Sequence, residues 1–433
     1  MKLRVAVNLL LLLLSACASG PRVLPPSTTV GTEAIYAALY PLYAEICALS
    51  AMNKKPGFGA QISSGIGGHA ILYLNGVCRS PTSEYPVLVQ CNDVPGKAGI
   101  DGVGISVNAH YANANWVAVE GRDFFFDGRM TPGQALTREA YAATLQEARA
   151  KKIFEGVSFH KEVFDDMPDG FTQADFKYEI STSTDFAIAF GRNRYCGRVP
   201  MNAAQMQAMI AYMNSLNEPY RSGQAVFDWN IITDNCAHVN HNALAAAHIW
   251  DIWETGRFIL VSIFDFPVPK NEFVNLVQRV NDMPIDDPLE VYRDDAARLL
   301  LMTQDRLPTQ PGAIIDLGRV ISQNDIYETD SPIIFYDDPI TGRYRRRYHS
   351  ILTEPRYFDL RENLTYFAKL YDDIKAKTRP LESYYAELGS SQEDRREFAV
   401  FYEKYNAYIS RISAEVTRKL AQLDRMTGYA KAS

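Results

Sequence analysis

GHAILYL at residues 68–74 and DNCAH at residues 234–238 are the two stretches that decide the predicted fold of this 433-residue chain. The first places His69 at the start of a strand, on the same face as every second residue after it. The second places Cys236 in the first turn of a helix, because the two residues before it are good N-cap residues. A thiol there lies among unpaired backbone N–H groups, which favour the reactive thiolate. With an imidazole nearby to accept its proton, the two stretches predict a Cys–His site.

Around these stretches the chain alternates between short β runs and helical patterns. Turn residues separate the β runs, and apolar side chains recur every three or four residues in the helical ones. The predicted strands cover residues 69–77, 85–90, 102–108, 116–120, 176–190 and 226–233, and the predicted helices cover residues 32–50, 138–152, 203–216 and 236–253. This order predicts an α+β domain over residues 32–256.

Beyond residue 256 the pattern becomes mainly helical. Helical spacing covers residues 271–280 and 288–302, within an irregular and helical extension over residues 257–360. Residues 361–433 carry two amphipathic patterns on either side of Pro380, which predict a helical hairpin. The apolar stripe of this hairpin is expected to pack on itself or on a second copy of the chain.

Composition excludes several classes of protein. Hydrophobic residues make up 47% of the chain and charged residues 22%, which are globular and not disordered proportions. The formal charge of −7, without a basic stripe, argues against nucleic acid as a partner. No apolar stretch reaches the length of a membrane-spanning helix, so a polytopic membrane protein is excluded.

The N-terminus has the pattern of an export signal, with a positive start, a short apolar run and small residues. The sequence Leu14-Ser15-Ala16-Cys17 resembles the lipobox of bacterial lipoproteins. This resemblance implies a signal peptide over residues 1–16, cleavage before Cys17 and lipidation of its sulfur, followed by a tether over residues 17–31. The acyl chains would hold the protein on membrane lipid. Ala18 would be the second residue of the mature lipoprotein. By the same resemblance, Ala in that position implies that the protein is sorted to the outer membrane, facing the periplasm.

Six cysteines are present, and lipidation of Cys17 would leave an odd number, five, in an oxidising compartment. Cys78 and Cys91 end two strand-like runs, so a disulfide could join them across a hairpin. Cys47 and Cys196 would then pair by elimination, with Cys236 left free, although other pairings remain open.

The Gly-His strand followed later by the Asn-Cys helix resembles the circularly permuted papain-like thiol enzymes, of the NlpC type. Asn235-Cys236-Ala237-His238 is similar to the lecithin:retinol acyltransferase-like group, and both stretches resemble a family of uncharacterised bacterial envelope lipoproteins. The resemblance covers roughly residues 57–253. It implies a permuted papain-like domain, an antiparallel sheet with helices, in which Cys236 is the nucleophile and His69 the base.

Papain-like sites add a third polar residue that orients the imidazole. Asn108, at the end of a later strand, is the first candidate, and His110 and Gln90 are the others. No cofactor or metal is expected, although a second interpretation places a metal ion on a helix face formed by His238, His241 and His248.

We therefore expect a lipid-anchored cell-envelope protein that acts as an amidase, peptidase or acyltransferase through an acyl-thioester on Cys236. Its substrates would be cell-wall peptides, lipids or lipoproteins. The alternative is a catalytically inactive envelope scaffold or binding lipoprotein that uses the C-terminal helices.

Overall fold

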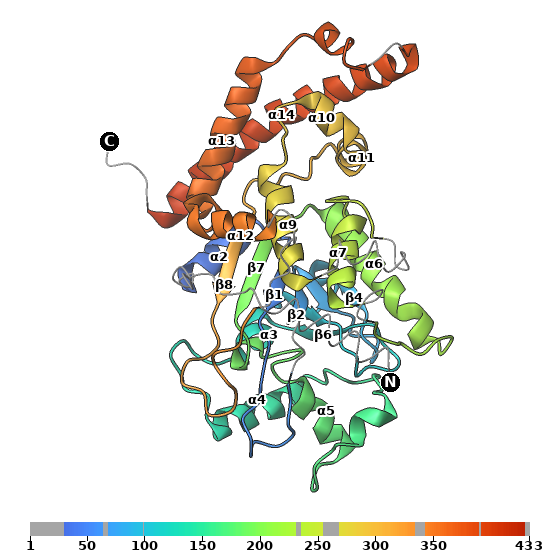
Figure 1. Ribbon diagram of the computed structural model, residues 1–433, viewed down its shortest axis with the longest axis vertical. Helices are drawn as coiled ribbons and strands as arrows, with labels where there is room; N and C mark the ends of the chain where they lie inside the picture. The colour runs from blue at the N-terminus through green and yellow to red at the C-terminus, as the bar shows by residue number, and fades with distance from the viewer. Residues whose placement is uncertain are drawn as a thin grey trace.

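The computed structural model describes residues 30–63, 68–97, 99–230, 235–253, 268–333, 343–388 and 391–428. Cys17 and the predicted signal peptide lie outside the described residues. A six-stranded antiparallel sheet lies at the centre of the molecule (Figure 1), in the order β6-β5-β2-β1-β7-β8. Its strands are β1 (Tyr43–Leu49), β2 (His69–Asn75), β5 (Gly102–Ser106), β6 (Val117–Glu120), β7 (Arg194–Pro200) and β8 (Ile314–Gly318). The predicted α+β class with an antiparallel sheet is confirmed.

The centre of the sheet is β1, in a segment for which the sequence predicted one helix over residues 32–50. The helix α2 (Val30–Leu39) ends just before Pro41, and the chain then becomes a fully buried strand. Proline disfavours helical backbone in the residue before it and has no N–H to donate. A strand buried on both faces lacks alternation and reads like a buried helix, so the prediction was wrong in its second half.

Two further strand predictions were wrong. Residues 176–190 form the end of α5 (Gln173–Ser181) and the 3-10 turn η4 (Ile188–Phe190). The helix α5 begins where the side chain of Thr172 accepts a hydrogen bond from the backbone N–H of Asp175. Residues 226–230 form no strand, and residues 231–234 lie outside the described residues.

Cysteine pairing follows the arrangement favoured by the sequence. Cys47 on β1 is bonded to Cys196 directly opposite on β7. Cys78 is bonded to Cys91 beside the small hairpin of β3 (Val77–Arg79) and β4 (Leu88–Gln90). Cys236 is a free thiol.

Helices cover both faces of the sheet. On one face α9 (Pro269–Asp282) lies against β1 and β7, where Gly197 leaves room for Leu276 and Val277. On the other face α3 (Arg122–Asp127) places the ring of Phe125 where a side chain on Gly104 of β5 would lie. The helix α7 (Cys236–Ala246) packs against β2 and against α6 (Ala203–Arg221), while α4 (Arg138–Ala150) and α5 lie at the far end in Figure 1.

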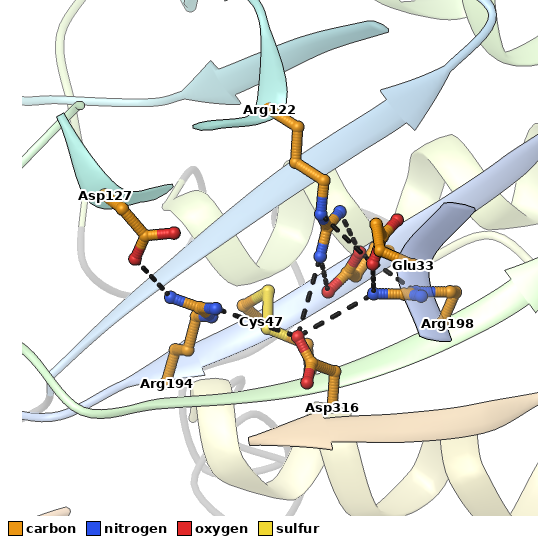
Figure 2. Close-up of a disulfide and its surroundings, with 9 residues drawn as sticks. Glu33, Cys47, Arg122, Asp127, Arg194, Arg198 and Asp316 are labelled. Atoms are coloured by element: carbon orange, nitrogen blue, oxygen red, sulfur yellow. Dashed lines mark hydrogen bonds and ion pairs between the residues drawn. A yellow bond between two sulfur atoms is a disulfide. The ribbon is translucent and has the colours of Figure 1, made fainter. Parts of the chain in front are cut away.

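A buried ion-pair network lies on the α3 face beside the Cys47–Cys196 disulfide (Figure 2). We define it as Glu45, Arg122, Arg198 and Asp316. The Glu45 side chain is fully buried and accepts two bonds from Arg122, at 2.6 and 3.1 Å, and one from Arg198 at 3.3 Å. These four residues come from β1, α3, β7 and β8, so the network ties segments that are distant in sequence to one sheet.

The C-terminal region is mainly helical, as predicted. The helices α13 (Leu360–Lys377) and α14 (Gln392–Thr427) pack against each other at one end of the molecule, with α10 and α11 beside α14 (Figure 1). The apolar stripe of α14 is buried in this packing, as the exposures of Phe398, Phe401 and Tyr405 show. The remaining helices are α10 (Pro288–Arg293), α11 (Asp295–Gln304) and α12 (Arg343–Thr353).

The segment predicted as an irregular extension also contributes to the sheet, because it contains the edge strand β8. The sheet is therefore completed by a strand that follows α7 by about seventy residues of chain. Of the helices that the structure describes, none combines the length and the apolar character needed to cross a membrane.

Candidate active site

The helix α7 begins at Cys236, and its first turn is held by a capping box. The side chain of Asn235 accepts hydrogen bonds from the backbone N–H groups of Ala237 at 2.8 Å and His238 at 3.2 Å. In return the Nδ1 atom of His238 accepts a bond from the N–H of Asn235 at 3.4 Å. Such reciprocal bonding satisfies the free donors of a helix start. The sequence correctly predicted Cys236 at a helix start, and His238 belongs to the cap.

The sulfur of Cys236 lies against the main chain at the start of β2. The backbone N–H of Ala70 donates to it at 3.4 Å. Since one carbonyl carbon separates that nitrogen from the Cα atom of His69, the sulfur lies within roughly 6 Å of that Cα. Two segments separated by more than 160 residues are thus brought together.

Burial keeps this thiol in its neutral form. Only 7% of Cys236 is exposed, and desolvation raises the pKa of its thiol. The N–H groups of Ala70 and Ala237 and the charge of Arg192 act in the opposite direction without outweighing burial. The sequence predicted that the helix start would favour the thiolate. The backbone N–H groups do lower the pKa of the thiol, but the opposite effect of burial is larger.

The imidazole of His69 is bonded to a relay of two side chains. Its Nε2 atom lies 2.9 Å from the hydroxyl of Ser106 on β5, which donates to Asp185 at 2.6 Å. Because a carboxylate only accepts, the Ser106 hydroxyl must donate to it, and its oxygen must accept from Nε2–H. The relay therefore assigns the proton to Nε2 and leaves the lone pair on Nδ1. Nδ1 is then the atom able to act as a base.

Asn108, the first sequence candidate for the orienting residue, does not bond to the imidazole. Its amide donates to both oxygens of Asp185, at 3.1 and 3.2 Å. Of the other candidates, Gln90 is bonded to Gln207, and the backbone N–H of His110 is bonded to Asn108. The orienting group in the structure is Ser106.

The relay residues were missed for identifiable reasons. Ser106 lies on the same predicted strand as Asn108, two residues earlier and on the same face, so strand periodicity could have indicated it. The antiparallel register pairs it with Ile71, beside His69. Asp185 was missed because its segment was predicted as a strand, whereas it lies in the turn between α5 and η4.

The imidazole is neutral as well. Burial, and to a smaller extent the charge of Arg192, lower the pKa of His69 to about 3. No hydrogen bond joins the Cys236 sulfur to the His69 ring within the part of the chain that the structure describes. The resting site is therefore a neutral thiol and a neutral imidazole that are not hydrogen-bonded to each other among the described residues.

The surroundings of His241 argue against the second interpretation, a metal ion held by His238, His241 and His248. His241 lies between Trp250 and Trp253, with ring centroids 4.2 and 4.1 Å away. Its Nδ1 atom is bonded to Glu272 at 2.8 Å and its Nε2 atom to the carbonyl of Asp251 at 2.9 Å. Both ring nitrogens are thus occupied by protein partners, and neither is open to a metal. The bond of the stacked ring to Glu272 fastens α7 to α9.

One group of potential metal ligands does occur among the described residues, formed by Glu45, Cys47 and Cys196. The two cysteines are bonded to each other, so neither offers a thiolate. Glu45 is bonded to Arg122 and Arg198 in the ion-pair network. The group is structural.

Gly68 positions His69, and its replacement gives a test of the local geometry. Its φ is +70°, and an added Cβ would lie 2.3 Å from the carbonyl oxygen of Leu49. We expect Gly68→Ala to lower the free energy of unfolding by about 2–4 kcal/mol, through left-handed backbone strain and overpacking. Chemical denaturation measures this loss.

The matched control is Gly57→Ala. Gly57 also has a positive φ, +86°, but an added Cβ would meet nothing within 4 Å. Only the backbone strain applies, so the expected loss is about 1 kcal/mol. Equal losses in the two variants would contradict the close approach of Gly68 to β1.

Comparison of the chain with protein-family models, with curated proteins and with solved structures found no match. The chemistry is therefore argued from the site itself. It combines a free thiol at a helix start, an adjacent imidazole with an assigned tautomer and a buried carboxylate behind it. These are the parts that nucleophilic catalysis by cysteine requires.

Proposed function

We propose that this protein is a thiol enzyme that transfers acyl groups through a thioester on Cys236. The observation that carries the proposal is the meeting of the Cys236 sulfur with the first residues of β2, where the ring of His69 is oriented by Ser106 and Asp185. A nucleophile, a base and a group orienting the base form the usual unit of covalent catalysis.

In the proposed reaction the sulfur attacks the carbonyl carbon of an ester, amide or thioester. The S–H proton passes to Nδ1 of His69 as the carbon–sulfur bond forms. It is then given to the leaving alcohol, amine or thiol as the bond to that group breaks. Asn235 accepts from the N–H groups of Ala237 and His238, so we assign the N–H of Cys236 as the donor to the oxyanion in this turn.

The second substrate decides the class of enzyme. Water as acceptor gives an amidase or peptidase, and an amine or alcohol gives an acyltransferase. We place the enzyme in the cell envelope, anchored through Cys17 to the outer membrane and facing the periplasm, with cell-wall peptides, lipids or lipoproteins as substrates. The permuted papain-like domain remains part of this proposal.

The experiment traps the intermediate on the full-length chain. The protein is incubated with a p-nitrophenyl acyl ester, digested and examined by mass spectrometry. We expect an acyl adduct on the peptide containing Cys236 that hydroxylamine removes, as it does thioesters. Cys236→Ala should abolish both the adduct and ester turnover, since no other unpaired thiol lies among the described residues.

The control is the folded state of the variant, measured by its thermal unfolding midpoint, because alanine at a buried position leaves a small cavity. Turnover that survives in a folded Cys236→Ala protein would refute the proposal. The scaffold alternative predicts instead that the unmodified protein forms no adduct and turns over no ester, and the observation that supports it is the lack of a direct bond between the Cys236 sulfur and the His69 ring within the described residues.

A further inference from the structure

Arg192 is a buried guanidinium that the proposed mechanism has not yet used. It lies between η4 and β7 with 1% of its surface exposed. Its Nε atom donates to the carbonyl of Ser183 at 2.9 Å, and its Nη1 atom donates to the carbonyl of Ser50 at 2.6 Å. Both acceptors are neutral, and no carboxylate of the described residues forms an ion pair with Arg192.

These two bonds place the guanidinium beside the candidate site. Ser50 directly follows Leu49, the register partner of His69 on β1. Ser183 belongs to the turn that carries Asp185, the end of the imidazole relay. The charge of Arg192 acts on Cys236 and on His69, and it is itself supported by Asp185 and influenced by Tyr327. Cys236, His69, Asp185 and Tyr327 are thus the titratable groups that face it.

Arg192 stays charged at neutral pH. Burial lowers its pKa to about 10, and the negative charge of Asp185 opposes that decrease. A buried cation without a direct ion pair is costly, and Asp185 offsets that cost only in part, since the pKa of Arg192 stays lowered; a further anion in the site would offset it more fully. The other buried arginines of the described residues, Arg122 and Arg198, already have carboxylates in the ion-pair network.

We propose that Arg192 is the fixed positive charge that stabilises the Cys236 thiolate, in place of an imidazolium on His69. This deepens, and rests on, the proposed thiol chemistry. When the S–H bond breaks, the electron pair stays on sulfur and faces the guanidinium. The proton leaves to solvent base in the absence of substrate, or passes through His69 to the leaving group during acyl transfer. Arg192 is a positioning residue, because it acts on the reactivity of Cys236.

The same charge disfavours a positive ring on His69. A resting thiolate–imidazolium pair would therefore not form, and thiol reactivity should increase once with pH, in the alkaline range. This distinguishes a fixed arginine cation from the ion-pair arrangement, in which reactivity begins in the acid range where the imidazole is charged.

The test measures the rate of iodoacetamide labelling at Cys236 between pH 4 and pH 10, on the full-length chain, by peptide mass spectrometry. We expect Arg192→Gln to slow labelling at pH 7.5 about tenfold or more and to raise the apparent thiol pKa by about one unit or more. Arg192→Lys keeps the charge and should stay within about threefold of the unmodified protein. Arg129→Gln, on a side chain that is 63% exposed, controls for net charge.

A second comparison holds even if Arg192→Gln fails to fold. In His69→Gln the labelling rate should still increase in the alkaline range. At acid pH it should equal the rate of the unmodified protein, because no thiolate–imidazolium pair contributes there. An acid shoulder in the unmodified protein that His69→Gln abolishes would overturn the proposal, as would a thiol that stays unreactive up to pH 10. Because labelling needs no acyl donor, this result is separate from whether Cys236 forms an acyl-enzyme.

Discussion

Replacing Glu45 by Gln should lower the free energy of unfolding by about 3–5 kcal/mol, because it removes the fully buried anion that bonds to both Arg122 and Arg198. The carboxylate of Glu45 lies between Arg122 and Arg198, and all three are buried. Asp316, the other acid of the ion-pair network, is more distant, at 3.6 and 3.7 Å from these two arginines. Glu33 remains, at 2.8 Å from Arg198 and 3.4 Å from Arg122, but its side chain is 34% exposed, so it replaces the lost buried charge only in part. Denaturant unfolding monitored by circular dichroism measures the change.

The matched control is Glu290→Gln, which removes the same charge from a pair with Arg293 whose side chains are both 54% exposed. Exposed pairs contribute about 0–1 kcal/mol, so this variant should unfold almost as the unmodified protein does. A loss below about 1 kcal/mol for Glu45→Gln would contradict the prediction that the two buried arginines depend on this carboxylate.

The same carboxylate gives a pH dependence with a definite sign. Burial alone would raise the pKa of Glu45, but the charges of Arg122 and Arg198 outweigh it, and the pKa is lowered. Because the pKa of Glu45 is lower in the folded state, its charge stabilises the fold fully above the unfolded pKa of about 4.3. This stabilisation is lost as the pH falls from that value through the lower folded pKa. Stability should thus decrease on acidification, and less steeply in Glu45→Gln.

Replacing Ser106 by Ala should slow formation of the Cys236 acyl-enzyme about 10- to 100-fold, a loss of the size seen when the partner that orients a metal-binding imidazole is removed. The Nε2–H of His69 would lose its acceptor, and neither the tautomer nor the orientation of the ring would remain fixed. The effect on stability should be small, about 1 kcal/mol, because one hydrogen-bonded hydroxyl is removed. Single-turnover kinetics with the p-nitrophenyl acyl ester measures the rate.

The variant Asn108→Ala tests whether Asn108 or Ser106 orients the imidazole of His69. Asn108 bonds to Asp185 and not to the ring, so its loss should slow the reaction much less than the loss of Ser106. If Asn108→Ala slowed acyl-enzyme formation and Ser106→Ala did not, the hydrogen bonds through Ser106 would not be what orients His69 during the reaction.

Local chemistry explains what could be predicted of the fold. Strand β2 and the start of α7 were recognised because alternation, a capping residue and the position of Cys236 are properties of a few adjacent residues. Strands β7 and β8 were missed, because the partners that complete them come from both halves of the chain and a strand alone carries little sequence signal.

The candidate site divides in the same way. The sequence indicated Cys236 and His69 from their local contexts, but it pointed to Asn108 where the structure has Ser106 beside the imidazole. Nothing local marks Arg192, whose importance comes from its burial against Ser50 and Ser183.

The sequence by itself determined the class of the fold and the helical C-terminal region, and it favoured Cys236 as the unpaired cysteine while leaving other pairings open. Tertiary structure alone decided that the thiol and the imidazole rest in their neutral forms, and which hydroxyl orients the ring. The physical reason is that desolvation and charge act over a few ångströms in space. The groups that set them here, from Ser50 to Cys236, are separated by up to 186 positions along the chain.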